Sequence, residues 1–260
     1  MEKSQENPKG GGILMILPKA QDVIHSIQLT RLLQAITDDT FLAQQLYFKG
    51  GTCATMLGYL DRFSVDLDFD LKKGGNKKKV DLKLIQIFKN LDLFIKNKSK
   101  ETLFYVLKYK TPGLGRNTLK ISVYTESTLA NQYTSAYIAG IDRYVNCQTI
   151  ETMFANKLVA LTERYVKRKQ IAGRDLYDIH YFFLQGYNYN EAVIQERIGK
   201  KPKDYFKQLI IFIKKYITNT IIDQDLNILL HGEMFKKVRN VLKQEVITML
   251  KAEIRKLEER

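Results

Sequence analysis

The sequence is poor in the residues that build disulfide scaffolds and metal-binding domains. Its two cysteines, Cys53 and Cys147, form no CxxC pair, which argues against a disulfide framework and against a cysteine zinc site. The three histidines are too scattered for a metal-ligand pattern: His25, His180 and His231. We therefore expect a protein of the reducing cytoplasm.

Long apolar runs are also missing. No uninterrupted stretch reaches the ~18 residues that a membrane span requires. The apolar stretch 13–17, which follows a polar N-terminus, is too short for the core of a signal peptide. The sequence therefore predicts no transmembrane segment and no secretory signal, and the metal–phosphate site described below leads us to expect no membrane partner.

What the chain does have is an ordinary globular composition and a large excess of positive charge. Of its 260 residues, 45% are hydrophobic and 27% are charged, which is enough for a real core in one or two domains. The formal net charge is +14, shared equally by residues 1–145 and 146–260. This surplus favours an anionic partner, such as a nucleotide, a nucleic acid or a membrane headgroup, without choosing among them.

Periodicity divides the chain into an α/β half and a helical half. Residues 1–12 read as a flexible leader. Apolar spacing predicts helices over residues 20–37, 53–60 and 80–96, strands over 46–48, 64–71, 102–110, 118–125 and 133–138, and a basic loop over 72–79. The first helix has its predicted apolar face at Val23, Ile27, Leu32 and Ile36. From about residue 149 onward only helical patterns occur, and because no Pro/Ser-rich linker marks the division near residue 145, we expect the halves to pack together.

The strand predicted over residues 64–71 alternates strictly between apolar and acidic positions. Its sequence, SVDLDFDL, puts Asp66, Asp68 and Asp70 on one open face. Successive carboxylates on that face are about 6–7 Å apart, so they repel each other unless a cation or solvent separates them. Oxygen ligands of this kind suit Mg²⁺. Taken alone, the pattern is more typical of an exposed strand with acidic outer positions than of a metal site.

A glycine turn precedes that strand by one helix. Gly50, Gly51 and Thr52 follow a predicted buried strand and begin a predicted helix. Glycines let the backbone approach a phosphate closely, and the first amides of a helix donate hydrogen bonds to it. The Thr52 hydroxyl could add a donor, although the same residues could form an ordinary turn with Thr52 as the helix N-cap. The turn and the carboxylates together describe one metal–phosphate site.

Residues 48–71, FKGGTCATMLGYLDRFSVDLDFDL, resemble the signature of the AbiEii/AbiGii-type nucleotidyltransferase toxins, a family of the DNA polymerase β-like superfamily. The family form begins K-G-G-T-A-L and ends R-F-S-x-D-x-D. The chain matches it at Lys49, Gly50, Gly51, Thr52, Arg62, Phe63, Ser64, Asp66 and Asp68, and has Cys53 where alanine is usual. The resemblance implies an α+β fold: a polymerase β-like core of mixed sheet and flanking helices over 13–145, then an all-helical C-terminal domain over 146–260.

The resemblance continues into the helical half and fades after about residue 185. Residues 151–164, ETMFANKLVALTER, are similar to the family's E-x-x-x-A-x-K-x-x-A-L-x-x-R helix, and residues 174–179, RDLYDI, to its R-D-x-x-D-[LI] segment. Lys157 lies on or beside the apolar stripe of its helix, with Arg164 on the same face. A lysine there usually snorkels to solvent, and Asp175 suits the start of a helix. The resemblance instead places Lys157 and Asp175 in the active cleft.

The resemblance implies Mg²⁺-dependent transfer of a nucleotide from an NTP to an acceptor hydroxyl, with release of pyrophosphate. It gives catalytic roles to Asp66, Asp68, Lys157 and Asp175, the first two also being the metal ligands. It gives nucleotide-binding roles to Gly50, Gly51, Thr52, Arg62 and Ser64.

In one respect the sequence departs from the superfamily, in which many enzymes place a third carboxylate on a later strand. The matching strand here is 119–124, LKISVY, and it has Ser122 at the expected position. Either Glu126 or Asp70 serves instead, or the protein lacks a strong general base.

The acceptor is suggested by charge. Basic runs at 72–79 and 167–169 would flank the cleft and favour a nucleic-acid acceptor such as a tRNA 3′ end, although lysine-rich loops are often merely solvated. The resemblance implies the toxin of a bacterial toxin–antitoxin pair in phage defence by abortive infection, with a separately encoded antitoxin. The alternatives are a non-catalytic nucleic-acid-binding module on a decayed transferase fold, or a transferase for a protein or small-molecule acceptor.

Overall fold

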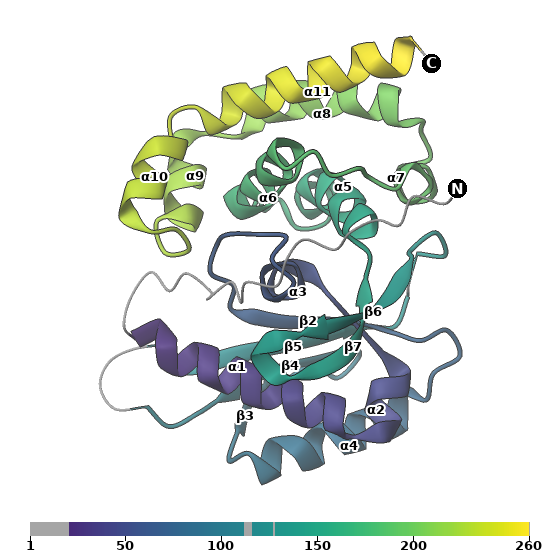
Figure 1. The fold of residues 1–260 in the computed structure, drawn as a ribbon, viewed down its shortest axis with the longest axis vertical. Coiled ribbons are helices and arrows are strands. Elements are labelled where there is room, and N and C mark those ends of the chain that lie inside the picture. Colours follow the sequence, from purple (N-terminus) through teal and green to yellow (C-terminus); the bar gives the residue numbers. More distant parts are fainter. Residues whose placement is uncertain (1–20, 112–115, 127, 260) are drawn as a thin grey trace, which may run out of the picture.

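The computed structural model describes residues 21–111, 116–126 and 128–259 of the chain (Figure 1). The predicted leader 1–12, the predicted start of the first domain at residue 13, and residues 112–115 between two predicted strands lie outside these residues. Within the described residues, no helix is long and apolar enough to cross a membrane.

The core of the N-terminal half is one mixed sheet, in which the described residues form seven strands. In chain order these are β1 (Leu46–Lys49), β2 (Asp66–Leu71), β3 (Phe94–Lys98), β4 (Leu103–Lys108), β5 (Thr118–Tyr124), β6 (Tyr133–Ile138) and β7 (Arg143–Gln148). The spatial order is β3-β4-β5-β2-β1-β7-β6. β2 lies between an antiparallel β1 and a parallel β5, so the acidic strand is central and its register is fixed from both sides.

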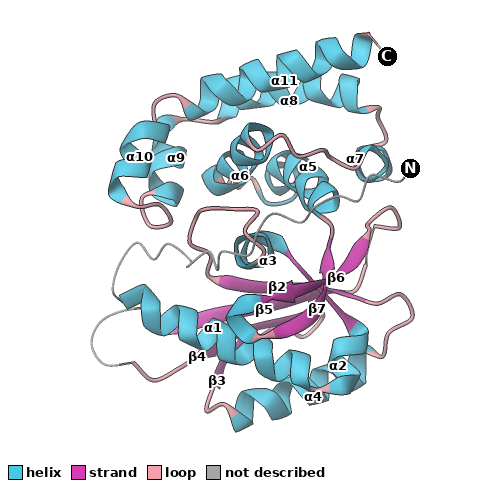
Figure 2. Ribbon diagram, viewed as in Figure 1, coloured by secondary structure: helices cyan, strands magenta, loops and turns pink. Residues whose placement is uncertain are grey.

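Helices cover both faces of the sheet (Figure 2). One face is covered by α1 (Gln21–Asp38), α2 (Thr40–Gln45) and α4 (Lys77–Asn90), and α3 (Gly50–Met56) lies on the other, toward the helical half. Because side chains alternate along β2, its apolar residues lie on one face of the sheet and its aspartates on the other. Leu67, Phe69 and Leu71 are buried in the core under α1, α2 and α4, and the aspartates point to the face on which α3 lies.

The C-terminal half is entirely helical over its described residues. It comprises α5 (Ile150–Arg168), α6 (Gly173–Leu184), α7 (Glu191–Ile198), α8 (Pro202–Tyr216), α9 (Asn219–Leu226), α10 (Gly232–Val238) and α11 (Leu242–Glu258). α5 begins directly after β7 because Thr149 caps it, its hydroxyl accepting a hydrogen bond from the Thr152 amide. α5 and α6 face the sheet, and α8 and α11 form the outer layer (Figure 1).

The predicted α+β class, a mixed sheet with flanking helices followed by an all-helical region, is confirmed. Several details differ. The strands β3 and β7 and the helix α2 were not predicted, and the basic loop is shorter than 72–79 because Asn76 caps α4, so that Lys77 already lies in the helix. The apolar face of α1 was assigned partly wrongly: Leu32 and Ile36 are buried, but Val23 and Ile27 are 41% and 50% exposed.

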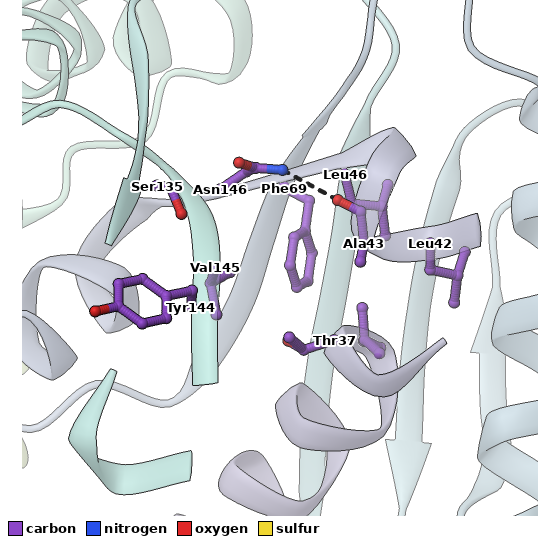
Figure 3. A pocket seen from close by; sticks show the side chains of 10 residues that line it. Thr37, Leu42, Ala43, Leu46, Phe69, Ser135, Tyr144, Val145 and Asn146 are labelled. Atoms are coloured by element: carbon purple, nitrogen blue, oxygen red, sulfur yellow. Dashed lines mark hydrogen bonds between the residues drawn. The ribbon is translucent and has the colours of Figure 1, made fainter. Parts of the chain in front are cut away.

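A small pocket lies on the sheet face away from the aspartates, between α1, α2 and β7 (Figure 3). Phe69 and Val145 contribute apolar walls, and the Asn146 amide spans its edge by donating a hydrogen bond to the Ala43 carbonyl. The pocket is therefore separated from the carboxylate face by the sheet itself.

Candidate active site

The glycine turn lies against the acidic strand. Lys49, the last residue of β1, is paired in register with Asp68 of β2, and α3 begins at Gly50. Gly50 has φ of +80°, and a Cβ atom added there would lie 2.9 Å from a carboxylate oxygen of Asp68. Glycine is thus required both by the backbone conformation and by the close approach of the carboxylate. The predicted link between the turn and the carboxylates is a direct contact.

Thr52 and Ser64 tie this turn to the strand from behind. The Thr52 hydroxyl donates to the Asp66 carbonyl, and its oxygen lies 2.8 Å from the Ser64 hydroxyl oxygen. Both side chains are buried. The two hydroxyls therefore satisfy protein groups and hold α3 against the start of β2.

Arg62 lies on the buried side of Gly51. A Cβ atom added to Gly51 would come within 2.7 Å of an Arg62 guanidinium nitrogen. The guanidinium donates to both carboxylate oxygens of Asp178 on α6, at 2.5 and 2.7 Å, and to the Phe63 carbonyl at 3.0 Å. Since Arg62 is only 3% exposed, its charge is used inside the protein to join the β2 segment to the helical half.

Lys157 and Asp175 come together at the same boundary. The Lys157 ammonium lies 2.9 Å from Asp175 and 2.8 Å from Asp178, and Arg164 donates to the other oxygen of Asp175 at 2.8 Å. Burial opposes ionisation of Asp175, but Lys157 and Arg164 together hold its pKa below the usual range. We call Arg62, Lys157, Arg164, Asp175 and Asp178 the buried ionic network, although Arg164, at its edge, has a side chain that is 42% exposed.

Asp66 and Asp68 lie on the open side of this network. Burial raises the pKa of Asp68, and the charge of Asp66 raises it further, while Lys49 and Lys157 oppose the change. Asp68 therefore has an electrostatic need for a cation that the surrounding protein only partly meets.

Asp70 does not belong to an open acidic face, and that prediction is wrong. It is 1% exposed, and its carboxylate accepts hydrogen bonds from Lys49 at 2.5 Å, from Gln148 at 2.7 Å and from Tyr133 at 3.0 Å. These groups come from β1, β7 and β6, so the Asp70 carboxylate anchors the sheet. It is poorly placed to serve as a catalytic base.

The basic loop was also misplaced. Residues 72–79 follow the far end of β2, where the Lys72 amide bonds the Gln45 carbonyl and the Asn76 amide bonds the Gln45 side chain. Gln45 precedes β1, whereas the glycine turn follows it. The loop therefore lies at the opposite end of the strands from Asp66 and does not border the carboxylates. Arg164 does border them.

The strand β5 provides no third carboxylate. Ser122 is paired in register with Asp68, as the sequence comparison predicts, and Glu126 lies exposed beyond the end of the strand. Two positions further along, Tyr124 is paired with Asp70 and is 52% exposed, with the Lys49 ammonium 3.8 Å from its ring centroid. Tyr124 and Lys49 are thus site residues to which sequence reasoning gave no role, although the period-2 register of β5 contained the signal for Tyr124.

The donor set fits Mg²⁺. No group of three or more His, Cys, Asp or Glu side chains within the described ranges could hold a metal ion. A pair of carboxylates on one sheet face remains, and Asp68 there is destabilised by its neighbour. Mg²⁺ is commonly bound by one or two protein carboxylates together with substrate phosphates and water. Asp66 and Asp68 could supply such a pair of carboxylates.

Two carboxylates on a sheet face, a glycine turn touching one of them and a lysine from a following helix form the arrangement expected of a nucleotidyltransferase site. The family comparison makes this specific. Residues 31–253 match the sequence model of the family described as "Nucleotidyl transferase AbiEii toxin, Type IV TA system". The chain belongs to this family: it is a nucleotidyltransferase toxin of a type IV toxin–antitoxin system, and an antitoxin is its expected partner. The family match extends well past residue 185, where the resemblance was predicted to fade.

Solved structures share the fold. JHP933 from Helicobacter pylori has 21% sequence identity and a TM-score of 0.57, over 93% of this chain and 95% of that one. A putative nucleotidyltransferase from H. pylori has 21% identity and a TM-score of 0.58, over 93% and 98%. MenT4, a nucleotidyltransferase toxin from Mycobacterium tuberculosis, has 16% identity and a TM-score of 0.53, over 89% and 84%. No curated relative matches the chain at a significant level.

Proposed function

We propose that this toxin transfers a nucleoside monophosphate from an NTP to a hydroxyl of an RNA acceptor, with tRNA as the leading candidate. The observation that supports this most strongly is the contact between Gly50 and the Asp68 carboxylate, which joins a phosphate-binding turn to a metal-binding strand. Asp66 and Asp68 would hold Mg²⁺. When bound, the ion supplies positive charge to the triphosphate.

In the proposed reaction the acceptor hydroxyl attacks the α-phosphorus in line, the bond to the β-phosphate breaks, and pyrophosphate and the hydroxyl proton leave. The backbone at Gly50 and Gly51 lets the phosphates approach closely. The Lys157 side chain is 14% exposed. Of the cations in the network, it is the one that we expect to neutralise charge on the leaving pyrophosphate. Positioning and electrostatics do most of the work, as in phosphoryl transfer generally.

We assign the remaining predicted site residues to positioning. Thr52 and Ser64 hold the turn against β2, and Arg62 and Asp175 hold the sheet and the helical half in register through the buried ionic network. We keep the proposed division into a core over 13–145 and a helical domain over 146–260, and place the cleft between them. The proposed setting is the cytoplasm, where NTPs and RNA are found, and the proposed biological role is abortive infection against phage.

The proposal is tested with purified protein, Mg²⁺, each labelled NTP in turn and total RNA. Label on RNA is expected from one or more NTPs, and it should vanish without Mg²⁺ and in Asp66→Ala/Asp68→Ala. Absence of transfer with retained RNA binding would favour the non-catalytic interpretation, which is supported by Ser122 in place of a third carboxylate and by the net charge of +14. Label on the protein itself would identify a protein acceptor.

A further inference from the structure

The carboxylate face continues onto an exposed aromatic ring. Tyr124 is on the same sheet face as Asp66 and Asp68, because residues paired in register on adjacent strands point the same way. Burial raises the pKa of the Tyr124 hydroxyl and Asp68 adds to this, whereas Arg164 and Arg168 lower it. The positive charges of both arginines therefore act on the Tyr124 hydroxyl from α5, the helix that faces the sheet.

The last turns of α5 lead from these arginines to a cluster of aromatic side chains. Tyr165 packs against Tyr216 at the end of α8, with 4.4 Å between ring centroids, and both rings contact Phe212, at 5.5 and 5.1 Å. The Lys169 ammonium lies 5.0 Å over the Tyr165 ring, and the Lys215 ammonium lies 5.0 Å over the Tyr216 ring.

Helix spacing places the aromatic ring and the arginines on neighbouring faces of α5. Tyr165 and Lys169 are one helical turn apart, as are Arg164 and Arg168, so the aromatic and the guanidinium groups occupy adjacent stripes of α5. Both lysines are exposed, and each covers a ring face with a flexible side chain that can move aside. A planar ligand could then replace the lysine on the ring, while the ammonium stays close enough to meet a phosphate.

Rings interleaved with cations are typical of surfaces that bind unpaired nucleic acid. Bases stack on aromatic side chains regardless of sequence, and lysine and arginine neutralise the phosphates between them. A duplex would offer the rings no base face. Tyr124, at one end of this surface, also shares the sheet face of the carboxylate pair, where an acceptor hydroxyl must arrive.

We propose that Tyr124, Arg168, Tyr165, Lys169, Tyr216 and Lys215 form a track, the α5–α8 track, that binds an unpaired segment of the acceptor RNA next to its reacting end. This inference rests on the proposed function for its acceptor. The reacting hydroxyl lies at Asp68, the adjoining nucleotide at Tyr124, and the next ones along the end of α5 toward Tyr216.

The track is tested by fluorescence anisotropy with a labelled single-stranded RNA of roughly ten nucleotides, within the usual range of site sizes. Tyr216→Ala should weaken binding about tenfold, because it removes a stacking ring, and Tyr216→Phe should bind as the wild type does. Lys169→Ala/Lys215→Ala should reduce the slope of log K against log[salt] by about 1.4, corresponding to two fewer phosphate contacts.

Tyr144→Ala is the matched control, since Tyr144 is 72% exposed and packs against Tyr137 on the β6–β7 hairpin, away from the track. It should bind RNA as the wild type does, and Tyr216→Ala should keep its affinity for the NTP. The track is refuted if Tyr216→Ala and Tyr144→Ala bind equally well, or if blunt duplex RNA binds as tightly as the single strand.

Failure of the track and failure of the proposed function give different results. If Asp66→Ala/Asp68→Ala abolishes transfer to RNA while Tyr216→Ala leaves the KM for RNA unchanged, the function stands and the track is wrong. If the wild type transfers nothing to RNA, yet single-strand binding depends on Tyr216 and on both lysines, the track stands and the proposed function is wrong.

Discussion

The buried ionic network makes a strong prediction about stability. Asp178 is fully buried and forms ion pairs with two cations. Both of its carboxylate oxygens accept hydrogen bonds from Arg62, and the Lys157 ammonium lies 2.8 Å from the carboxylate. In Asp178→Asn the shape is kept, but the amide has only one accepting oxygen and loses the charge. The Arg62 side chain, 2% exposed, then loses its paired carboxylate in a site that water barely reaches, while the charge of Asp175 still acts on it.

Removing one partner of a buried ion pair costs about 3–5 kcal/mol. A domain of this size loses about 2–4 °C in Tm per kcal/mol, so Asp178→Asn should unfold roughly 6–20 °C below the wild type. The matched control is Asp38→Asn, which breaks a 2.8 Å pair with Arg143 between side chains that are 46% and 41% exposed. A pair this exposed contributes about 0–1 kcal/mol, so the control should melt within a few degrees of the wild type.

The assay is thermal and urea unfolding followed by circular dichroism between pH 8 and pH 3. Burial opposes ionisation of Asp178, but Arg62 and Lys157 hold its pKa below the usual range. Its contribution is therefore complete above the unfolded pKa of about 4 and is lost as the pH falls below it. The penalty of Asp178→Asn should be constant from pH 8 to pH 5 and should shrink below pH 4. Equal stability of Asp178→Asn and Asp38→Asn at pH 7 would refute the reasoning.

Four further predictions concern the candidate site and His25. In differential scanning fluorimetry, Asp68→Asn should raise Tm at pH 7 but not below about pH 4, because a carboxyl with a raised pKa destabilises the fold once it ionises. In the same assay, Mg²⁺ should raise Tm in the wild type and not in Asp66→Ala/Asp68→Ala. Gly50→Ala should lose nearly all transfer activity, whereas Gly74→Ala, with a similar φ of +75° but open space around it, should keep it and lose only about 1 kcal/mol of stability. Burial lowers the pKa of His25 to about 4, so between pH 6.5 and pH 4 the unfolded chain binds a proton that the folded chain does not. The free energy of unfolding of the wild type should therefore fall by about 3 kcal/mol over that range. His25→Gln should remove this pH dependence in urea titrations.

The class of the fold and the identity of the carboxylates could be predicted because they depend on local pattern. Alternation in residues 64–71 fixes which side chains share a face of β2, and the glycines mark where the backbone turns. The strand β3 was missed because its five residues, FIKNK, all lie exposed at the sheet edge and show no alternation in burial. Edge strands carry little of the apolar signal from which strands are predicted.

The misplacements have a different origin. Asp70 looks the same as Asp66 in the sequence, and only the meeting of β1, β6 and β7 around it shows that its charge is neutralised inside the sheet. The lysines of residues 72–79 were placed beside the carboxylates because they are near in sequence. Six residues of β2 extend about 20 Å, which carries that loop to the other end of the sheet.

The role of Arg62 was also missed because its partner is distant in the sequence: Asp178 is 116 residues away. Arg62 stands inside the R-F-S-x-D-x-D motif, and Asp178 inside the R-D-x-x-D-[LI] segment, so each motif read alone suggests a group that contacts substrate. The structure pairs them with each other, and Lys157 joins the pair from a third segment. Since Arg62 also lies against Gly51, a shift of α6 relative to the sheet would move the glycine turn and the lysine together. The network thus makes the geometry of the candidate site depend on how the two halves pack, a dependence that neither motif shows when it is read alone.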